Sequence, residues 1–208
     1  MRVGQRRKVF QAIEKSYRRN LSTTVPIIVR FDGKNVTKNH EKFHLMDVDG
    51  FTKDILCAAK SMVNGMECTI YAALDEVSVV FHKPFEFFGK TQDKDLLYSA
   101  IMILQDFLRY TREVYPGVKF NVTVYNIGFD QIDSYIQYRK DMAYQTAVTY
   151  YAKEYLPPQT YVDKSTSYIL EALRSNGYNV SSEEILRFFS GTVVYTHSDP
   201  LCIGGTLI

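Results

Sequence analysis

Apolar and polar residues alternate along this chain in patterns that predict a mixed structure of strands and helices. Short runs rich in β-branched and aromatic residues, bounded by Gly, Pro or acidic residues, are typical of strands. Four such runs cover residues 25–31, 68–73, 77–81 and 118–125. The second and third runs flank the polar pair Asp75-Glu76, so we predict a hairpin there. The first run is expected to end at Asp32-Gly33.

Longer stretches repeat apolar residues at a spacing of three and four, which predicts helices. They cover residues 50–64, 93–114 and 130–155. In chain order the elements read β-α-β-β-α-β followed by a helix, which is the split βαβ arrangement of ferredoxin-like domains. We therefore expect an α+β fold in which a βαββαβ sheet carries its helices on one face.

The remaining segments flank this sheet. Residues 1–24 are predicted to form a basic N-terminal helix, and residues 25–155 the main domain. Residues 156–208 are expected to form a small helical appendage, with a late strand at residues 191–195. We find no internal repeat and no low-complexity tract.

Composition narrows the class of protein. The 208 residues carry 25 Lys and Arg against 23 Asp and Glu, and this net charge of +2 argues against a protein that coats nucleic acid. Cys57, Cys68 and Cys202 are odd in number and lack a CxxC spacing, which favours reduced thiols and a cytoplasmic location. No apolar run approaches the roughly 20 residues that span a bilayer, so no membrane partner is expected.

The positive charge is concentrated at the N-terminus. Residues 1–24 contain seven Lys and Arg and one Glu, a net charge of +6. Val9, Phe10, Ile13 and Tyr17 recur at helical spacing, so the segment is either a solvated surface helix or a helix that faces phosphates. On the second interpretation the contacts to nucleic acid are Arg6, Arg7, Arg18 and Arg19.

Three carboxylates are predicted to meet at one end of the sheet. In a split βαβ sheet the end of the first strand lies beside the turn between the second and third strands, which brings Asp32 to Asp75 and Glu76. Such a cluster needs compensating charge, and Mg²⁺ bound by one or two carboxylates and substrate phosphates supplies it. The alternative is an ordinary Asp-Gly turn and a polar hairpin tip.

The motifs around these acids resemble a known family. Residues 27–36 (IIVRFDGKNV), 41–43 (EKF) and 74–81 (LDEVSVVF) together resemble the tRNA-His guanylyltransferases and their bacterial and archaeal "like" proteins. The resemblance extends from about residue 25 to 155. Residues 120–125 look like that family's fourth palm strand, and residues 138–141 (YRKD) resemble its Trp-Arg-Gln-x-Asp segment.

The resemblance implies a polymerase-like palm that adds nucleotides to RNA 5′ ends. Asp32, the Gly33 carbonyl and Asp75 would ligate two Mg²⁺ ions, with Glu76 as a third catalytic acid beside them. ATP or GTP would activate a 5′ monophosphate, and the 3′-hydroxyl of an incoming nucleotide would then attack it. The nucleotide-binding residues implied are Lys34, Asn35, Val36, Thr37, Leu74, Lys90 and Lys94. Arg139 and Asp141 would support the site or bind the RNA end.

Departures from the family pattern affect the expected substrate. Residues 143–146 (AYQT) stand where the eukaryotic enzymes carry His-Ile-Asn-Asn, Leu74 replaces a Ser, and Tyr138 replaces a Trp. These differences favour 5′-end repair of tRNA or a similar RNA over strict addition of one guanosine to tRNA-His. Two alternatives stay open: a palm-type nucleotide cyclase or oligonucleotide synthase, and a nucleotide- or RNA-binding module without activity. The resemblance also suggests a homo-oligomer, a tetramer or a dimer.

Four tyrosines form a dense group in the last predicted helix. They are Tyr144, Tyr150, Tyr151 and Tyr155, close in sequence to Arg139 and Lys140. Aromatic and cationic side chains together can stack unpaired bases. Tyrosine also packs helices in a chain that has no Trp, and this packing role is the favoured interpretation.

Overall fold

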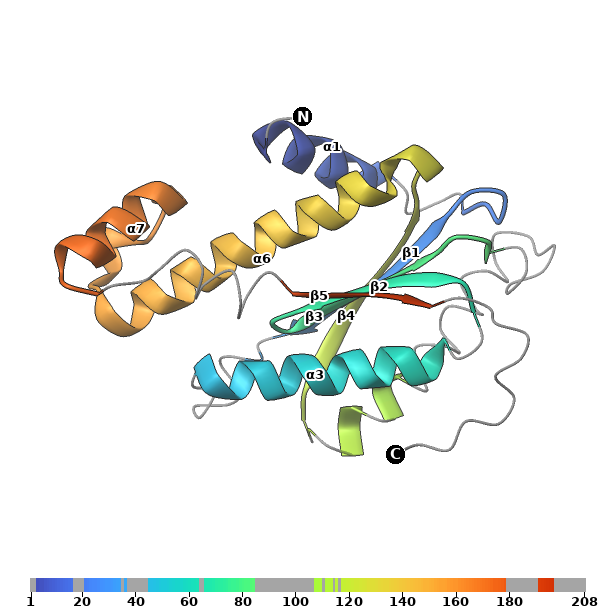
Figure 1. Ribbon diagram of the computed structural model, residues 1–208, viewed down its shortest axis with the longest axis horizontal. Helices are drawn as coiled ribbons and strands as arrows, with labels where there is room; N and C mark the ends of the chain where they lie inside the picture. The colour runs from blue at the N-terminus through green and yellow to red at the C-terminus, as the bar shows by residue number, and fades with distance from the viewer. Residues whose placement is uncertain are drawn as a thin grey trace.

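The computed structural model has one antiparallel sheet with helices on both of its faces (Figure 1). It describes residues 3–16, 21–34, 36, 45–63, 66–84, 107–109, 111–113, 115, 117–178 and 191–196. The elements are α1 Val3–Ser16, β1 Ile27–Lys34, α3 Leu45–Met62, β2 Cys68–Ala73, β3 Glu76–Phe81, β4 Lys119–Asn126, η1 Phe129–Gln131, α6 Ile132–Tyr155, η2 Pro158–Thr160, α7 Thr166–Ser175 and β5 Thr192–Thr196.

The strand order confirms the predicted split βαβ arrangement. The sheet runs β4-β1-β3-β2-β5, and β1 is antiparallel to both of its neighbours, β3 and β4. β2 and β3 form the predicted hairpin. β5 lies in the segment expected to be a helical appendage, and it pairs with β2 as an edge strand of the sheet. The late strand was therefore correctly predicted, although residues 156–208 are not only helical.

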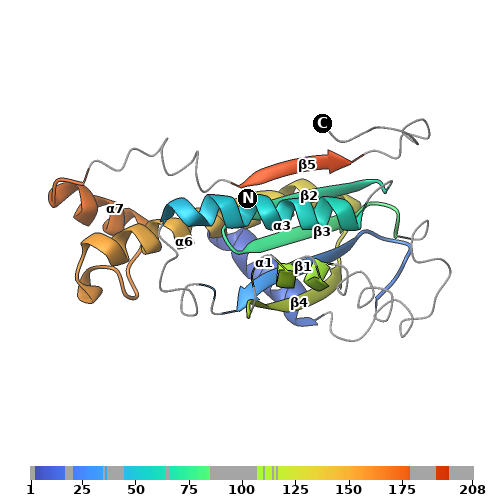
Figure 2. The same cartoon turned by 90° about the horizontal axis from the view of Figure 1, so that it is seen from below.

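One face of the sheet packs against α3 and residues 107–113. Ile27, Val29 and Phe31 of β1 point into this core, where Phe31 stacks on Phe107 with ring centroids 4.2 Å apart. Val118, Phe120, Val122 and Val124 also face it. Figure 2 shows α3 lying across this face. Residues 107–109 and 111–113 are helical, and the rest of the predicted helix 93–114 lies outside the described residues.

The opposite face is covered by α1 and α6, so the prediction of helices on one face is wrong for the sheet as a whole. The prediction is correct only for the described helical residues between β1 and β2 and between β3 and β4. Ile28 of β1 packs on this side with Phe10 of α1 and Tyr135 of α6. The physical reason is that α1 precedes the βαββαβ unit, α6 follows it, and both have apolar residues to bury.

The basic N-terminal helix is shorter than predicted. α1 ends at Ser16, and residues 21–26 are not helical. Phe10 is buried and Ile13 packs against the core, as the spacing predicted, but Val9 is 40% exposed. Among the described helices none is long and apolar enough to cross a bilayer.

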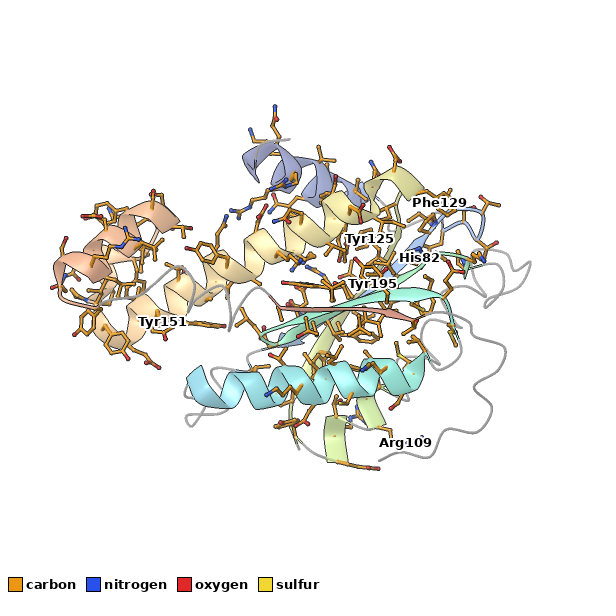
Figure 3. All side chains as sticks on the ribbon, viewed as in Figure 1. His82, Arg109, Tyr125, Phe129, Tyr151 and Tyr195 are labelled. Carbon is orange, nitrogen blue, oxygen red and sulfur yellow. The ribbon has the colours of Figure 1, made fainter. Side chains whose placement is uncertain are left out.

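The outer half of α6 extends beyond the sheet and packs against α7 (Figures 1 and 3). Val148 and Ala152 of α6 join Ile169 and Leu173 of α7 in the core. The rings of Tyr151 and Tyr155 stack, and Tyr155 contacts Tyr178 with centroids 4.5 Å apart. These contacts support the packing interpretation of the tyrosine group. α6 ends before Pro157, where Leu156 is extended as a residue before proline prefers to be.

Candidate active site

Asp32 lies near the end of β1, an interior strand of the sheet. It pairs with Glu76 of β3 on one side and with Asn121 of β4 on the other. β1 does not end at Asp32-Gly33 as expected but continues to Lys34, because β4 supplies strand partners for both Gly33 and Lys34. Side chains of directly paired residues share a face, so Asp32 projects on the same face as Glu76. This is the face that α1 and α6 cover.

A two-residue turn presents Asp75 beside Asp32. Leu74 adopts a left-handed conformation with φ of 55°, which is uncommon for a residue with a Cβ. Two hydrogen bonds hold the turn: the Thr52 hydroxyl of α3 donates to the Leu74 carbonyl at 2.7 Å, and the Gly33 amide donates to the Asp75 carbonyl at 2.8 Å. The turn is thereby tied to a helix and to β1 at once.

Gly33 allows this close approach because it has no side chain. A Cβ at this position would lie 2.4 Å from Cγ2 of Val36 and 2.9 Å from Cβ of Asp75. Contacts this short would push the turn away from β1. The Asp32-Gly33 sequence is therefore required by the site, and it is not the tight turn that the alternative interpretation assumed.

Asp32 and Asp75 form a pair of neighbouring carboxylates. Burial, and then the nearby charge of Asp32, raises the pKa of Asp75 to about 7. Among the described residues neither carboxylate has an ion-pair partner, and no group of three His, Cys, Asp or Glu side chains could hold a metal. Two carboxylates and the Gly33 carbonyl fit Mg²⁺, which completes its coordination with water and substrate phosphates.

Glu76, the third acid of the predicted cluster, is paired with arginines. Its carboxylate accepts two hydrogen bonds from Arg139 of α6, one of them from Nε at 2.6 Å, and it lies 3.6 Å from Arg30. Burial raises the pKa of Glu76, and both guanidinium groups oppose that shift. The carboxylate therefore joins α6 to the sheet, and its oxygens are already occupied by charged donors.

Sequence reasoning did not anticipate the partners that surround Glu76. The Ser78 hydroxyl lies 2.9 Å from the hydroxyl of Tyr135, and it reaches Glu76 at 3.4 Å. The Arg139 guanidinium also lies over the Tyr138 ring, 5.1 Å from its centroid. The Ser within the Asp-Glu-x-Ser motif was the available signal, since a strand places residues two apart on one face.

The residues predicted to bind RNA do not all converge on Asp32. Arg6 of α1 forms an ion pair with Asp141 of α6 at 2.8 Å, and Asp141 also accepts a hydrogen bond from Gln137. Arg139 is engaged with Glu76, whereas Arg7 is exposed on α1. An ion pair thus links α1 to α6, and its two members, Arg6 and Asp141, were predicted to bind RNA.

The predicted nucleotide-binding residues are distributed unevenly. Lys34 is exposed at the end of β1, opposite Lys119 of β4, while Val36 and Leu74 are buried in the core. Six predicted site residues lie outside the described part of the chain: Arg18, Arg19, Asn35, Thr37, Lys90 and Lys94.

The fold matches solved structures of tRNA(His) guanylyltransferases and similar proteins. A bacterial tRNA(His) guanylyltransferase (Thg1)-like protein in complex with ATP aligns with a TM-score of 0.65 and 19% identity over 95% of this chain and 90% of that one. Such a protein in complex with GTP aligns with a TM-score of 0.50 and 22% identity over 78% and 76%. The tRNA(His) guanylyltransferase of Saccharomyces cerevisiae aligns with a TM-score of 0.62 and 17% identity over 86% and 89%.

No family model and no curated protein matches the sequence. The fold is therefore established by structural similarity, and the palm-like sheet expected from the sequence motifs is confirmed.

Proposed function

We propose that this protein is a Mg²⁺-dependent nucleotidyltransferase of the tRNA guanylyltransferase type that adds nucleotides to the 5′ end of tRNA or a similar RNA. The observation that carries the proposal is the pair Asp32 and Asp75, two carboxylates that lie together at one end of the sheet and have no ion-pair partner among the described residues. Structurally similar proteins bind ATP and GTP, which supports nucleoside triphosphates as substrates here.

Asp32, Asp75 and the Gly33 carbonyl would hold the metal. When bound, Mg²⁺ neutralises phosphate charge and makes a hydroxyl a better nucleophile. The chain's own contribution is positioning: Thr52 and Gly33 fix the turn that carries Asp75, and the Arg30–Glu76–Arg139 contacts fix the first residue of β3. Phosphoryl transfer depends mainly on positioning and charge neutralisation, so no His or Cys nucleophile is required.

Two transfers would take place at this site. First, a 5′-phosphate oxygen of the RNA attacks the α-phosphorus of ATP or GTP, and pyrophosphate leaves. Next, the 3′-hydroxyl oxygen of an incoming nucleoside triphosphate attacks the activated 5′ phosphorus, a phosphodiester bond forms and the nucleoside monophosphate leaves. Lys34, exposed two residues beyond Asp32, is suited to hold the phosphates of the incoming nucleotide.

The segment that departs from the eukaryotic motif supports repair over single guanosine addition. Residues 143–146 lie in the middle of α6, and Ala143 is buried there against the core. A buried Ala offers no polar group to an RNA end, unlike the His of the eukaryotic motif. We therefore assign 5′-end repair as the reaction. A homo-oligomer and a cytoplasmic location stay predictions.

The test is an extension assay with purified protein. Labelled nucleoside triphosphates, Mg²⁺ and a 5′-monophosphorylated tRNA lacking its first nucleotide should give RNA lengthened at the 5′ end. Asp32→Asn and Asp75→Asn should each lower the rate by about 100- to 1,000-fold, and Asp133→Asn, an exposed Asp of α6, should leave it unchanged.

Each of the other products rejects the proposal in a different way. A cyclic or linear oligonucleotide made from triphosphates alone would identify a palm-type cyclase or oligonucleotide synthase. Nucleotide binding without any turnover would identify a binding module. Full activity in both Asp variants would remove the metal assignment.

A further inference from the structure

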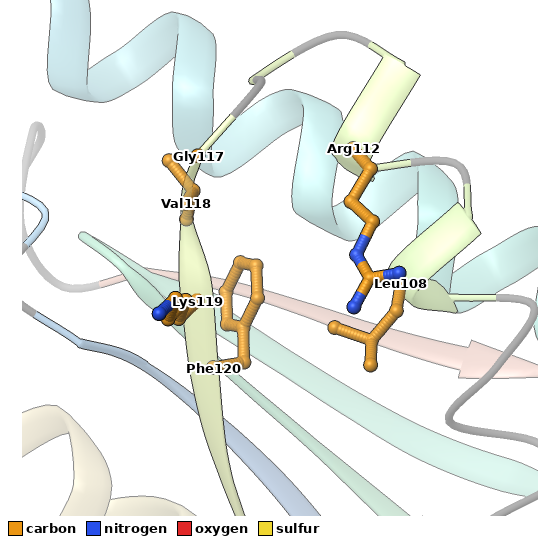
Figure 4. Close-up of a pocket in the computed structure, with 6 residues that line it drawn as sticks. All are labelled: Leu108, Arg112, Gly117, Val118, Lys119 and Phe120. Atoms are coloured by element: carbon orange, nitrogen blue, oxygen red, sulfur yellow. The ribbon is translucent and has the colours of Figure 1, made fainter.

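The strand register places two lysines on the same face of the sheet as the candidate metal site. Lys34 of β1 lies directly opposite Lys119 of β4, as Asp32 lies opposite Asn121. Directly paired residues share a face, and so do residues two apart along a strand, so Lys34, Lys119 and Asp32 project on one side of the sheet. Phe120 packs into the core on the α3 side, and Figure 4 shows the side chains of Lys119 and Phe120 on opposite sides of β4.

This pair of like charges has no ion-pair partner in the part of the chain that the structure describes. Lys34 and Lys119 are both exposed, and neither forms an ion pair with a described residue. The next two residues of β4 on this face, Asn121 and Thr123, are uncharged. Like charges directly opposite each other on neighbouring strands are destabilising. An anionic ligand that lies over both lysines would relieve their repulsion.

The position of the pair beside the metal site narrows the choice of anion. Lys34 lies two residues beyond Asp32, and two residues of an extended strand span roughly 7 Å. A nucleoside triphosphate bound at the carboxylates can extend its outer phosphates along β1 over such a distance. Its terminal phosphate resembles a phosphoserine in charge, roughly −1.5 to −2 near neutral pH, and so matches two ammonium groups. A phosphate within an RNA strand carries a single negative charge and matches only one of them.

We infer that Lys34 and Lys119 together bind the terminal phosphate of a nucleoside triphosphate whose inner phosphates lie toward Asp32 and Asp75. The inference rests on the proposed function for the triphosphate, and it adds Lys119, which no sequence motif identified, as a substrate-binding residue. Because the two lysines contact a phosphate and no base, they bind ATP and GTP alike.

Equilibrium binding of triphosphate analogues tests this inference without turnover. The full chain, with Mg²⁺ and no RNA, is titrated calorimetrically with the α,β-methylene analogues of ATP and GTP, which cannot be cleaved at the α-phosphorus, and separately with AMP. Lys119→Met should weaken both analogues by about 10-fold, the size of one charge-assisted hydrogen bond. It should leave AMP binding unchanged, since AMP has no outer phosphates.

Matched variants separate this contact from surface charge in general. Lys119→Arg keeps the charge and should retain most of the affinity. Lys60→Met removes an exposed lysine of α3, on the opposite face of the sheet, and should bind both analogues as the natural protein does.

Urea unfolding without nucleotide gives a second readout. Lys119→Met should raise the urea midpoint because it removes one of two like charges, and the rise should be smaller when Lys34 is already Met. Lys60→Met should not raise the midpoint. A change that stabilises the empty protein and weakens triphosphate binding indicates a binding role, which a purely structural lysine would not show.

The outcomes separate this inference from the proposed function. No analogue binding by the natural protein, unchanged analogue binding in Lys119→Met, or an equal loss for AMP or in Lys60→Met overturns the inference. Weaker binding of a 5′-monophosphorylated RNA with unchanged analogue binding also overturns it and assigns Lys119 to RNA. Weaker analogue binding in Lys119→Met, with no tRNA extension by the natural protein, leaves the lysine pair standing and rejects the proposed function. Extension by the natural protein with unchanged analogue binding in Lys119→Met does the reverse.

Discussion

At the level of single residues, Asp75 links the stability of the fold to the candidate chemistry. Its pKa is raised from 3.8 to about 7, so the folded state holds its proton more tightly than the unfolded chain does. The protonated carboxyl of Asp75 therefore contributes to the free energy of unfolding. This contribution is fully present below pH 3.8 and is lost as the pH rises through 7. The shift in the pKa of Asp75 corresponds to at most about 4 kcal/mol in the free energy of unfolding.

Asp75→Asn should therefore stabilise the metal-free protein, and by more at pH 8 than at pH 5.5. Urea unfolding in EDTA at the two pH values measures this difference, with Asp133→Asn as a control that should show none. Mg²⁺ should stabilise the natural protein at pH 8 and the Asn variant much less. An Asn variant that is less stable than the natural protein at pH 8 would contradict the unpaired state of this carboxylate.

Thr52 is a second residue with a testable role, since its hydroxyl holds the carbonyl of the left-handed Leu74. Thr52→Val keeps the shape of the side chain and leaves that carbonyl without its donor, at a cost of about 1–2 kcal/mol. We expect the Mg²⁺ concentration for half-maximal extension to rise several-fold, because Asp75 is carried by the same turn. Thr52→Ser should restore it. If the Val and Ser variants require the same Mg²⁺ concentration, Thr52 has only a packing role.

At the level of elements, the pairing of Glu76 with Arg139 attaches α6 to the edge of the site. Both side chains are buried, so removal of one partner leaves the other charge poorly compensated. Arg139→Met should destabilise the protein by about 3 kcal/mol, and Arg139→Lys should restore little because Lys cannot form the two parallel hydrogen bonds.

A double-mutant cycle with Glu76→Gln measures this coupling by urea unfolding. The double variant Glu76→Gln/Arg139→Met should be closer in stability to the natural protein than Arg139→Met alone, since no unpaired carboxylate is left behind. Additive losses would mean that the pairing contributes nothing of its own and that Arg30 alone satisfies Glu76.

At the level of the whole molecule, the sequence predicts the parts of the site that strand order determines. The split βαβ arrangement requires the end of β1 to meet the β2–β3 turn, so Asp32 and Asp75 could be placed together from local patterns. The engagement of Glu76 by Arg139 was not predictable in this way. It depends on the orientation of α6, whose Tyr and Ala residues are spread around the helix and do not define one buried face.

The same limit applied to the second helical face of the sheet. The position of α1 depends on Phe10, which stacks on Tyr138, and on the ion pair of Arg6 with Asp141, 135 residues further along the chain. Charge composition alone could not distinguish Arg6 from the other arginines of residues 1–24.

The structure separates two of those arginines, and this gives a prediction for RNA binding. Arg7 is exposed, so Arg7→Gln should lower the slope of log affinity against log salt by about 1 if α1 faces phosphates, with unchanged unfolding. Arg6 is held by Asp141, so Arg6→Gln should reduce stability by about 1 kcal/mol and change the salt slope less. Filter binding from 50 to 200 mM salt and urea unfolding measure both effects. Equal salt slopes for Arg7→Gln and the natural protein would leave α1 with the structural role that its contacts to α6 already give it.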